Sequence, residues 1–151
     1  MGGFSIWHVL ILLVLFVPCL VLAFLPALVK PRGPNRYGTP APSQTFPSAF
    51  VTCLKKYADF SGRAARSEYW WYRLAVALIL AAGAIATRGS VLTDLISLAF
   101  FLPDLAVTAR RLHDLNRSAW WILLSFTGFG IVSLIVLLAW PSQKDDPAKV
   151  F

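Results

Sequence analysis

Arg66-Ser67-Glu68-Tyr69-Trp70-Trp71 leads into an apolar run that ends at Thr87, and Arg117-Ser118-Ala119-Trp120-Trp121 leads into another that ends at Trp140. Arginine suits lipid phosphates, serine can cap free backbone N–H groups, and indole rings settle at the headgroup level of a bilayer. The repeated pattern predicts two membrane-spanning helices that begin at the same water boundary and point the same way.

Apolar residues dominate the composition: 58% of the 151 residues are hydrophobic and only 14% are charged. They gather in four runs, which cover residues 4–29, 69–87, 91–109 and 119–140. Crossing the hydrocarbon core of a bilayer, about 30 Å thick, takes roughly 20 helical residues. We therefore predict an all-α membrane protein with four transmembrane helices. The first run has neither a basic start nor an Ala-x-Ala cleavage site, so we expect it to be retained as a span.

Basic residues, which give the chain a net charge of +7, are distributed unevenly around these runs. The segments after the first and third runs carry ten of them: Lys30, Arg32, Arg36, Lys55, Lys56, Arg63, Arg66, Arg110, Arg111 and Arg117. The segments on the other side carry Arg88, Lys144 and Lys149. The positive-inside rule then places both basic segments in the cytoplasm and both termini outside. This distribution favours contact with anionic headgroups over contact with nucleic acid.

The long segment between the first two runs has two parts. Residues 30–47 are rich in Pro, Gly and Ser, which predicts an extended cytoplasmic linker. Residues 48–60 place apolar side chains at helical spacing beside Lys55 and Lys56, which predicts a short amphipathic helix in the membrane interface. The expected organisation is an N-terminal transmembrane helix (1–29), the linker (30–47), a three-helix membrane core with the interfacial helix (48–140) and a short polar tail (141–151).

Two charged residues fall inside the predicted spans. Arg73 lies six residues after Ser67, and Asp104 lies six residues before Arg110 on the returning helix. At a rise of 1.5 Å per residue, both sit roughly 9 Å from the cytoplasmic boundary. Because charges inside a membrane are costly unless they are paired, we predict a structural Arg73–Asp104 ion pair within the bundle, with a proton relay as the alternative.

A longer motif surrounds the first tryptophan pair. Phe60-Ser61-Gly62-Arg63-Ala64-Ala65-Arg66-Ser67-Glu68-Tyr69-Trp70-Trp71 is followed by Leu102-Pro103, by Ala106-Val107-Thr108-Ala109-Arg110-Arg111-Leu112-His113-Asp114, and by Arg117-Ser118-Ala119-Trp120-Trp121. Over residues 55–140 the chain thus resembles the bacterial inner-membrane family called domain of unknown function 805. The resemblance implies a small polytopic inner-membrane protein and implies no activity. Arg73 and Asp104 depart from the family pattern.

Two segments near the N-terminus depart from that family in their position. Gly33-Pro34-Asn35-Arg36-Tyr37-Gly38 looks like an element that family members often carry in a C-terminal tail. Met1-Gly2-Gly3-Phe4-Ser5-Ile6-Trp7-His8 is similar to the start of the pore-forming subunits of twin-arginine translocation, although Val17-Pro18 stands where their Phe-Gly hinge is expected. This second resemblance agrees with a periplasmic N-terminus.

The two motifs place a cluster of charged groups at the cytoplasmic boundary: Arg63, Arg66, Glu68, Arg110, Arg111, His113, Asp114 and Arg117. We expect Glu68 to bridge the two motifs as a clamp; the alternative is a headgroup or substrate site lined by the arginines and His113. Asp114 is spaced to pair with Arg110 or with Arg117. The expected interface anchors are the six tryptophans: Trp7, Trp70, Trp71, Trp120, Trp121 and Trp140.

The chain offers no pattern typical of catalysis or of metal binding. His8 and His113 belong to opposite sides of the predicted bilayer, and Cys19 and Cys53 fall too far apart in the topology to pair. We therefore expect no enzyme activity, no metal and no cofactor.

The function that fits best is a non-catalytic accessory, assembly or scaffolding subunit of a larger membrane complex, in contact with other membrane subunits. The alternatives are an oligomeric small transporter or channel, with Arg73, Asp104 and Asp94 along its path, and a protein that binds anionic lipids.

Overall fold

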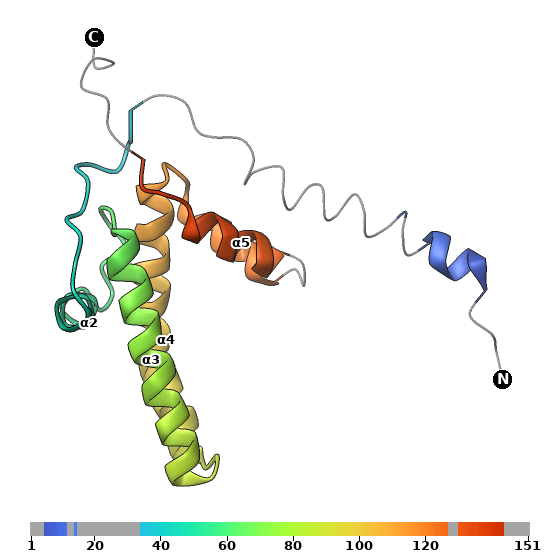
Figure 1. The fold of residues 1–151 in the computed structure, drawn as a ribbon, viewed down its shortest axis with the longest axis horizontal. Coiled ribbons are helices and arrows are strands. Elements are labelled where there is room, and N and C mark those ends of the chain that lie inside the picture. The colour runs from blue at the N-terminus through green and yellow to red at the C-terminus, as the bar shows by residue number, and fades with distance from the viewer. Residues whose placement is uncertain (1–4, 12–13, 15–33, 127–129, 144–151) are drawn as a thin grey trace. The chain divides into compact units, whose positions relative to one another are not determined.

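The structure, a computed structural model, describes residues 5–11, 14, 34–126 and 130–143. It forms two units, one made of residues 1–30 and 122–137 and the other of residues 31–121 and 138–151. The elements are α2 (Phe46–Lys55), α3 (Arg66–Thr87), α4 (Val91–Asp114), the 3-10 helix η1 (Ala119–Phe126) and α5 (Gly130–Ala139) (Figure 1). Residues 6–11 are also helical, and no strand occurs in the described ranges. The all-α class predicted from the sequence is confirmed.

An antiparallel hairpin of α3 and α4 forms the centre of the second unit (Figure 1). The turn between them uses left-handed backbone conformations at Arg88 (φ 52°) and Gly89 (φ 72°), and Ser90 is the N-cap of α4. The two helices have 22 and 24 residues, which gives lengths of about 33 and 36 Å. Both are therefore long enough to cross a bilayer.

The composition and exposure of this hairpin suit a membrane. Both helices are apolar enough to span one, and over their most apolar stretches only 17% of α3 and 22% of α4 is buried. A core helix of a soluble protein would be mostly buried. The hairpin accordingly matches the second and third predicted spans.

Pro103 lies inside α4 and does not end it. Proline has no backbone N–H, so the carbonyl of Ala99, four residues earlier, has no helical donor. The Tyr57 hydroxyl donates a hydrogen bond to that oxygen at 2.5 Å. A side chain from the segment after α2 thus replaces the missing helical hydrogen bond.

The helix α2 packs across the hairpin and is seen nearly end-on while α3 and α4 run down the view (Figure 1). Its first turn is stabilised by a hydrogen bond from the Thr45 backbone N–H to the Ser48 hydroxyl at 3.0 Å. Ala49 and Cys53 are buried, whereas Val51 and Leu54 on the other side are exposed. The predicted amphipathic helix is present, but it covers Phe46–Lys55 and not residues 48–60.

The α2 boundaries differ from the prediction for local reasons. Pro47 is tolerated in the first turn because the N–H groups there have no helical acceptor. At the other end, Asp59 accepts hydrogen bonds from both the backbone N–H and the hydroxyl of Ser61, at 3.0 and 2.5 Å. That local turn replaces the last predicted helical turn.

The fourth predicted span does not form one continuous α-helix. Residues 119–126 form η1 and residues 130–139 form α5, which at ten residues is about 15 Å long, half the thickness of a bilayer core. Most of the first predicted span, residues 4–29, lies outside the described residues.

Candidate functional site: a buried charge network where α3 begins and α4 ends

Glu68 and Arg110 form a buried ion pair at the base of the hairpin. The antiparallel arrangement brings the first turn of α3 beside the last turns of α4. The Arg110 Nη1 atom lies 2.5 Å from the Glu68 Oε1 atom, and neither side chain is more than 2% exposed. An acid near a helix N-terminus and a base near a helix C-terminus each also complement the helix dipole. Glu68 therefore joins the two motifs, as the clamp hypothesis predicted.

Asp114 is the centre of a second buried set of contacts. The Arg63 Nε atom lies 2.9 Å from the Asp114 Oδ1 atom, and Arg111 Nη1 donates to Oδ2. The predicted partners, Arg110 and Arg117, were both wrong. Arg110 faces Glu68, and Arg117 follows the end of the helix at Leu115 and the left-handed Asn116 (φ 56°), so its i+3 spacing no longer holds.

Arg117 stacks on an indole ring. Its guanidinium carbon lies 5.4 Å from the centre of the Trp121 ring, which is a cation–π contact within the second motif. Arg66 of the first motif is exposed. Arg66 and Arg117 belong neither to the Glu68–Arg110 pair nor to the Asp114 contacts, and the third such member of the cluster, His113, stacks on Tyr37.

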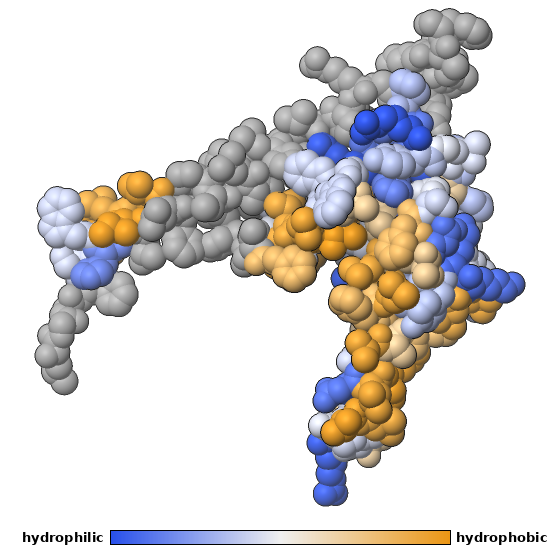
Figure 2. All heavy atoms as spheres, turned by 180° about the vertical axis from the view of Figure 1, so that it is seen from behind, coloured by the Kyte–Doolittle hydropathy of each residue, from blue (hydrophilic) through white to orange (hydrophobic). Residues whose placement is uncertain are grey.

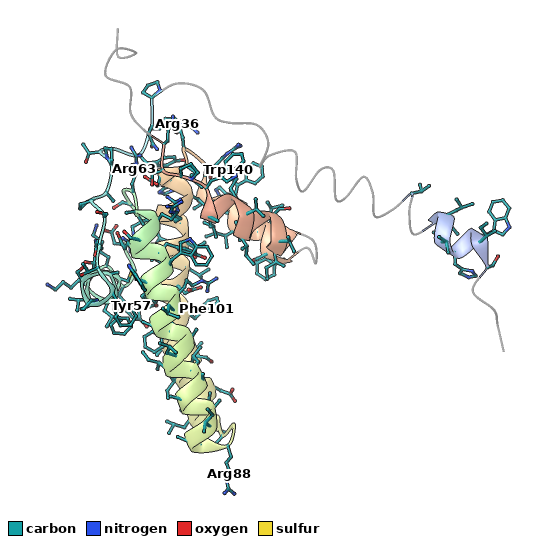
Figure 3. The ribbon with its side chains drawn as sticks, viewed as in Figure 1. Arg36, Tyr57, Arg63, Arg88, Phe101 and Trp140 are labelled. Atoms are coloured by element: carbon teal, nitrogen blue, oxygen red, sulfur yellow. The ribbon has the colours of Figure 1, made fainter. Side chains whose placement is uncertain are left out.

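The guanidinium groups of Arg63 and Arg111 carry more N–H donors than the Asp114 carboxylate can accept. Backbone carbonyl oxygens accept others. Arg111 Nε donates to the Leu138 carbonyl at 3.1 Å, and its Nη2 atom donates to the carbonyl of Trp140. Arg63 donates to the carbonyls of Gly38 at 3.2 Å and of Gln143 at 2.7 Å. These bonds tie the linker, α4 and the C-terminal segment together at the end of the hairpin opposite Arg88 (Figure 3).

Asn35 caps the C-terminus of α4. Its side-chain Nδ2 atom donates to the carbonyls of His113 at 2.9 Å and of Asp114 at 3.2 Å. Asn116 completes the contact by accepting from the Arg36 N–H at 3.3 Å, and the Tyr37 ring stacks on His113 with a centroid distance of 3.9 Å. We call residues 34–38 the clip. It binds helix-end carbonyls that also accept backbone N–H groups, His113 from Asn116 at 2.9 Å and Asp114 from Gln143 at 3.4 Å.

Cys53 lies directly against the first ion pair. Its Sγ atom is 3.8 Å from Glu68 Oε1 and 4.0 Å from Arg110 Nη2, and the side chain is fully buried. Burial, and then the negative charge of Glu68, raise the pKa of this thiol to about 12. The thiol is therefore protonated at neutral pH, a form that neither attacks as a nucleophile nor binds a metal.

The predicted Arg73–Asp104 pair is also present in the structure. Arg73 Nη1 lies 2.8 and 2.9 Å from the two carboxylate oxygens, and Nε donates to the Tyr69 hydroxyl at 3.1 Å. The side chains are 46% and 24% exposed, so the pair lies on the outer surface of the hairpin and not enclosed within it. The sequence analysis placed both residues at the same level on neighbouring antiparallel helices, and the structure pairs them.

These features fit one family. The family described as Protein of unknown function (DUF805) matches residues 57–148, more than half of the chain. The chain belongs to the DUF805 family. The DUF805 match includes both ion-paired motifs and Tyr57, whereas the clip and α2 precede it.

Two relatives support the same assignment. The Escherichia coli K12 inner membrane protein YhaI is 42% identical over 97 residues, which cover 59% of this chain and 78% of the relative. The inner membrane protein YhaH of the same strain is 33% identical over 109 residues, which cover 66% of this chain and 88% of the relative. No solved structure matches the chain significantly. The resemblance of residues 1–8 to a translocation subunit stays a prediction.

The remaining predicted site residues are the six tryptophans, of which Trp140 accepts a hydrogen bond from Arg111 at its carbonyl. Trp7, Trp70, Trp71 and Trp120 are exposed, and Trp121 and Trp140 are half-buried. His8 belongs to the other unit. Among the residues that the structure describes, no group of three or more His, Cys, Asp or Glu side chains could hold a metal ion.

Several network residues were not predicted from the sequence. No partner was predicted for Asn35, Cys53 or Tyr57. For Asn35, the resemblance of residues 33–38 to an element of the family was a signal that this segment matters.

Proposed function

We propose that this chain is a small bacterial inner-membrane protein that serves as a non-catalytic accessory, assembly or scaffolding subunit of a larger membrane complex. One observation carries the proposal: five of the eight clustered motif residues are buried and bonded to other parts of the same chain. They are Arg63, Glu68, Arg110, Arg111 and Asp114. Charged groups held in this way build a rigid junction and do not face a substrate.

The surface that such a protein offers to other membrane proteins is mainly the exposed apolar side of the α3–α4 hairpin. In the view of Figure 2, apolar residues cover the half of the hairpin nearest the α3–α4 turn, and the turn itself is hydrophilic. Leu78 is 56% exposed, Ile85 80% and Leu98 67%. In a membrane these side chains contact lipid or the helices of another protein.

The proposed topology puts the charge network on the cytoplasmic side and both termini in the periplasm. Lys55, the last residue of α2, and its C-cap residue Lys56 are exposed, as expected for an in-plane helix whose basic end faces cytoplasmic water. The similarity of the first eight residues to translocation subunits supports the same direction of insertion.

Anionic lipid binding is a second candidate, supported by Lys55, Lys56 and Arg66, which are exposed. Each such cation near an anionic leaflet contributes about 1 kcal/mol. Arg63, Arg110 and Arg111 do not add to this surface because they are buried in ion pairs. The lipid surface is therefore smaller than the charge count of the cytoplasmic segments suggested.

Gentle extraction of the tagged chain in lipid nanodiscs, followed by mass spectrometry, tests the accessory function. We expect one or more other membrane proteins to co-purify in a fixed ratio. A Leu78→Ala/Leu98→Ala variant, altered on the lateral surface, should lose them, and Lys55→Ala/Lys56→Ala should retain them. Recovery of the chain without any other protein in fixed ratio would contradict the proposal.

A further inference from the structure

We propose that two copies of this chain associate side by side in the membrane through the face of the α3–α4 hairpin that carries Arg73 and Asp104. This contact goes beyond the accessory function and does not depend on it. It involves neither the buried charge network nor α2.

The Arg73–Asp104 pair leaves polar groups exposed on the surface of the hairpin. Both residues lie within helices that are long and apolar enough to span a membrane. The Arg73 side chain is 46% exposed and that of Asp104 is 24% exposed. Within the described residues, Nη2 of Arg73 makes no hydrogen bond, while Nε and Nη1 bond to Tyr69 and Asp104. Exposure of such groups to hydrocarbon is costly, so this face requires a polar partner.

The signs of the charges favour a second copy over a lipid headgroup. A phosphate that approaches the Arg73 guanidinium also approaches the Asp104 carboxylate, whose oxygens lie 2.8 and 2.9 Å from Nη1. A surface with one donor and one acceptor is instead complementary to itself. In a two-fold dimer, Arg73 of one copy faces Asp104 of the other, and the reverse contact forms by symmetry.

Depth favours the same partner. Two copies inserted in the same direction, related by an axis along the membrane normal, carry their pairs at the same level. The two exposed pairs therefore meet without any adjustment of either hairpin. An unrelated helix would need a polar group at that level.

The shape of this face allows close approach. Ala77, Ala81 and Ala84 follow Arg73 by four, eight and eleven residues, and all three are exposed. At 100° per residue they lie along the same side of α3, where small side chains let helix backbones come together. Ile79, by contrast, lies on the other side of the helix.

Cysteine cross-linking in inner-membrane vesicles tests the dimer. The parent protein is Cys19→Ala, which keeps only the buried Cys53. Ala77→Cys and Ser97→Cys are introduced separately on the proposed face, and Ile79→Cys is the matched control on the opposite side of α3. With a short bis-maleimide reagent, we expect at least one of the two face positions to give a band at twice the 16.7 kDa monomer mass. The control should give at least fivefold less.

Charge variants then test the cause of association. Arg73→Ala in the best cross-linking background should reduce the dimer band at least fivefold. The exchanged variant Arg73→Asp/Asp104→Arg keeps a pair within one chain and the complementarity between copies, so it should restore the band. No dimer at either face position, or equal cross-linking at residue 79, would overturn the proposal. If no other membrane protein co-purifies in the extraction experiment, the accessory function fails, but the cross-linking result expected here does not change. The two proposals therefore fail separately.

Discussion

Tyr57 donates its hydroxyl hydrogen bond to the carbonyl of Ala99, the oxygen that Pro103 leaves without a helical donor. The bond joins residues 42 positions apart and holds the segment after α2 against the middle of α4. It explains why α4 continues through a proline without a break.

Removal of this hydroxyl should destabilise the fold. Tyr57→Phe removes the hydrogen bond to the Ala99 carbonyl; because this bond is exposed, we expect a loss of about 0.5–1.5 kcal/mol, the usual net contribution of one hydrogen bond. Thermal unfolding in detergent, followed by tryptophan fluorescence, should show a lower midpoint. In a Pro103→Ala background the helix regains its own N–H donor, so the same change should cost much less. Equal losses in both backgrounds would rule out this role for Tyr57.

The Glu68–Arg110 pair should be far more sensitive than the exposed charges beside it. Glu68→Ala leaves a buried guanidinium without its carboxylate, and breaking a buried pair in this way costs about 3–5 kcal/mol. Arg66→Ala, two residues away and exposed, should change the free energy of unfolding by less than about 0.5 kcal/mol. Denaturation in mixed micelles measures both. Similar values for the two variants would contradict burial of the pair.

Cys53 should not react with alkylating reagents in the folded protein. Its thiol is buried and its pKa is raised from 9.0 to about 12. In the Cys19→Ala protein, N-ethylmaleimide at pH 7–9 should label Cys53 only after unfolding. Lys55→Cys in a Cys53→Ala background is exposed on the same helix and should react within minutes. Rapid labelling of native Cys53 would disprove its protected position.

The same pKa shift predicts a loss of stability at alkaline pH. The folded state favours the protonated thiol, so the contribution of Cys53 is fully present below about pH 9 and is lost as the pH rises to about 12. The stability of the Cys53→Ala protein should fall less steeply over that range. Parallel pH profiles for the two proteins would show that the thiol does not titrate as described.

The clip should protect the linker from proteolysis. Asn35→Ala removes two hydrogen bonds to the end of α4, at 2.9 and 3.2 Å. We expect a loss of about 1 kcal/mol, since capping bonds are typically of this size, and faster tryptic cleavage after Arg36. Thr39→Ala, an exposed change nearby, should leave the cleavage rate as it is. Equal rates for both would show that the clip does not hold the linker.

Much of the membrane architecture was readable from the sequence because it depends on local patterns. Apolar length located α3 and α4, and equal depth on neighbouring helices predicted the Arg73–Asp104 pair. The fourth apolar run shows the limit of that reasoning. Hydropathy measures how apolar a stretch is, but it does not distinguish one α-helix from the combination of η1 and α5.

The sequence by itself thus determined the all-α class, the family motifs and the depth of the charges within the hairpin. Only the tertiary structure decided which charges are buried and which groups they bind. Arg63 meets Asp114 across 51 positions, Arg110 meets Glu68 across 42, and Asn35 reaches the end of α4 across 78. Hydropathy and helical spacing act along one dimension of the chain, whereas these contacts depend on how separate segments pack. Three of the arginines that the sequence analysis assigned to the cytoplasmic side, Arg63, Arg110 and Arg111, thus form bonds in the folded chain that hold its segments together.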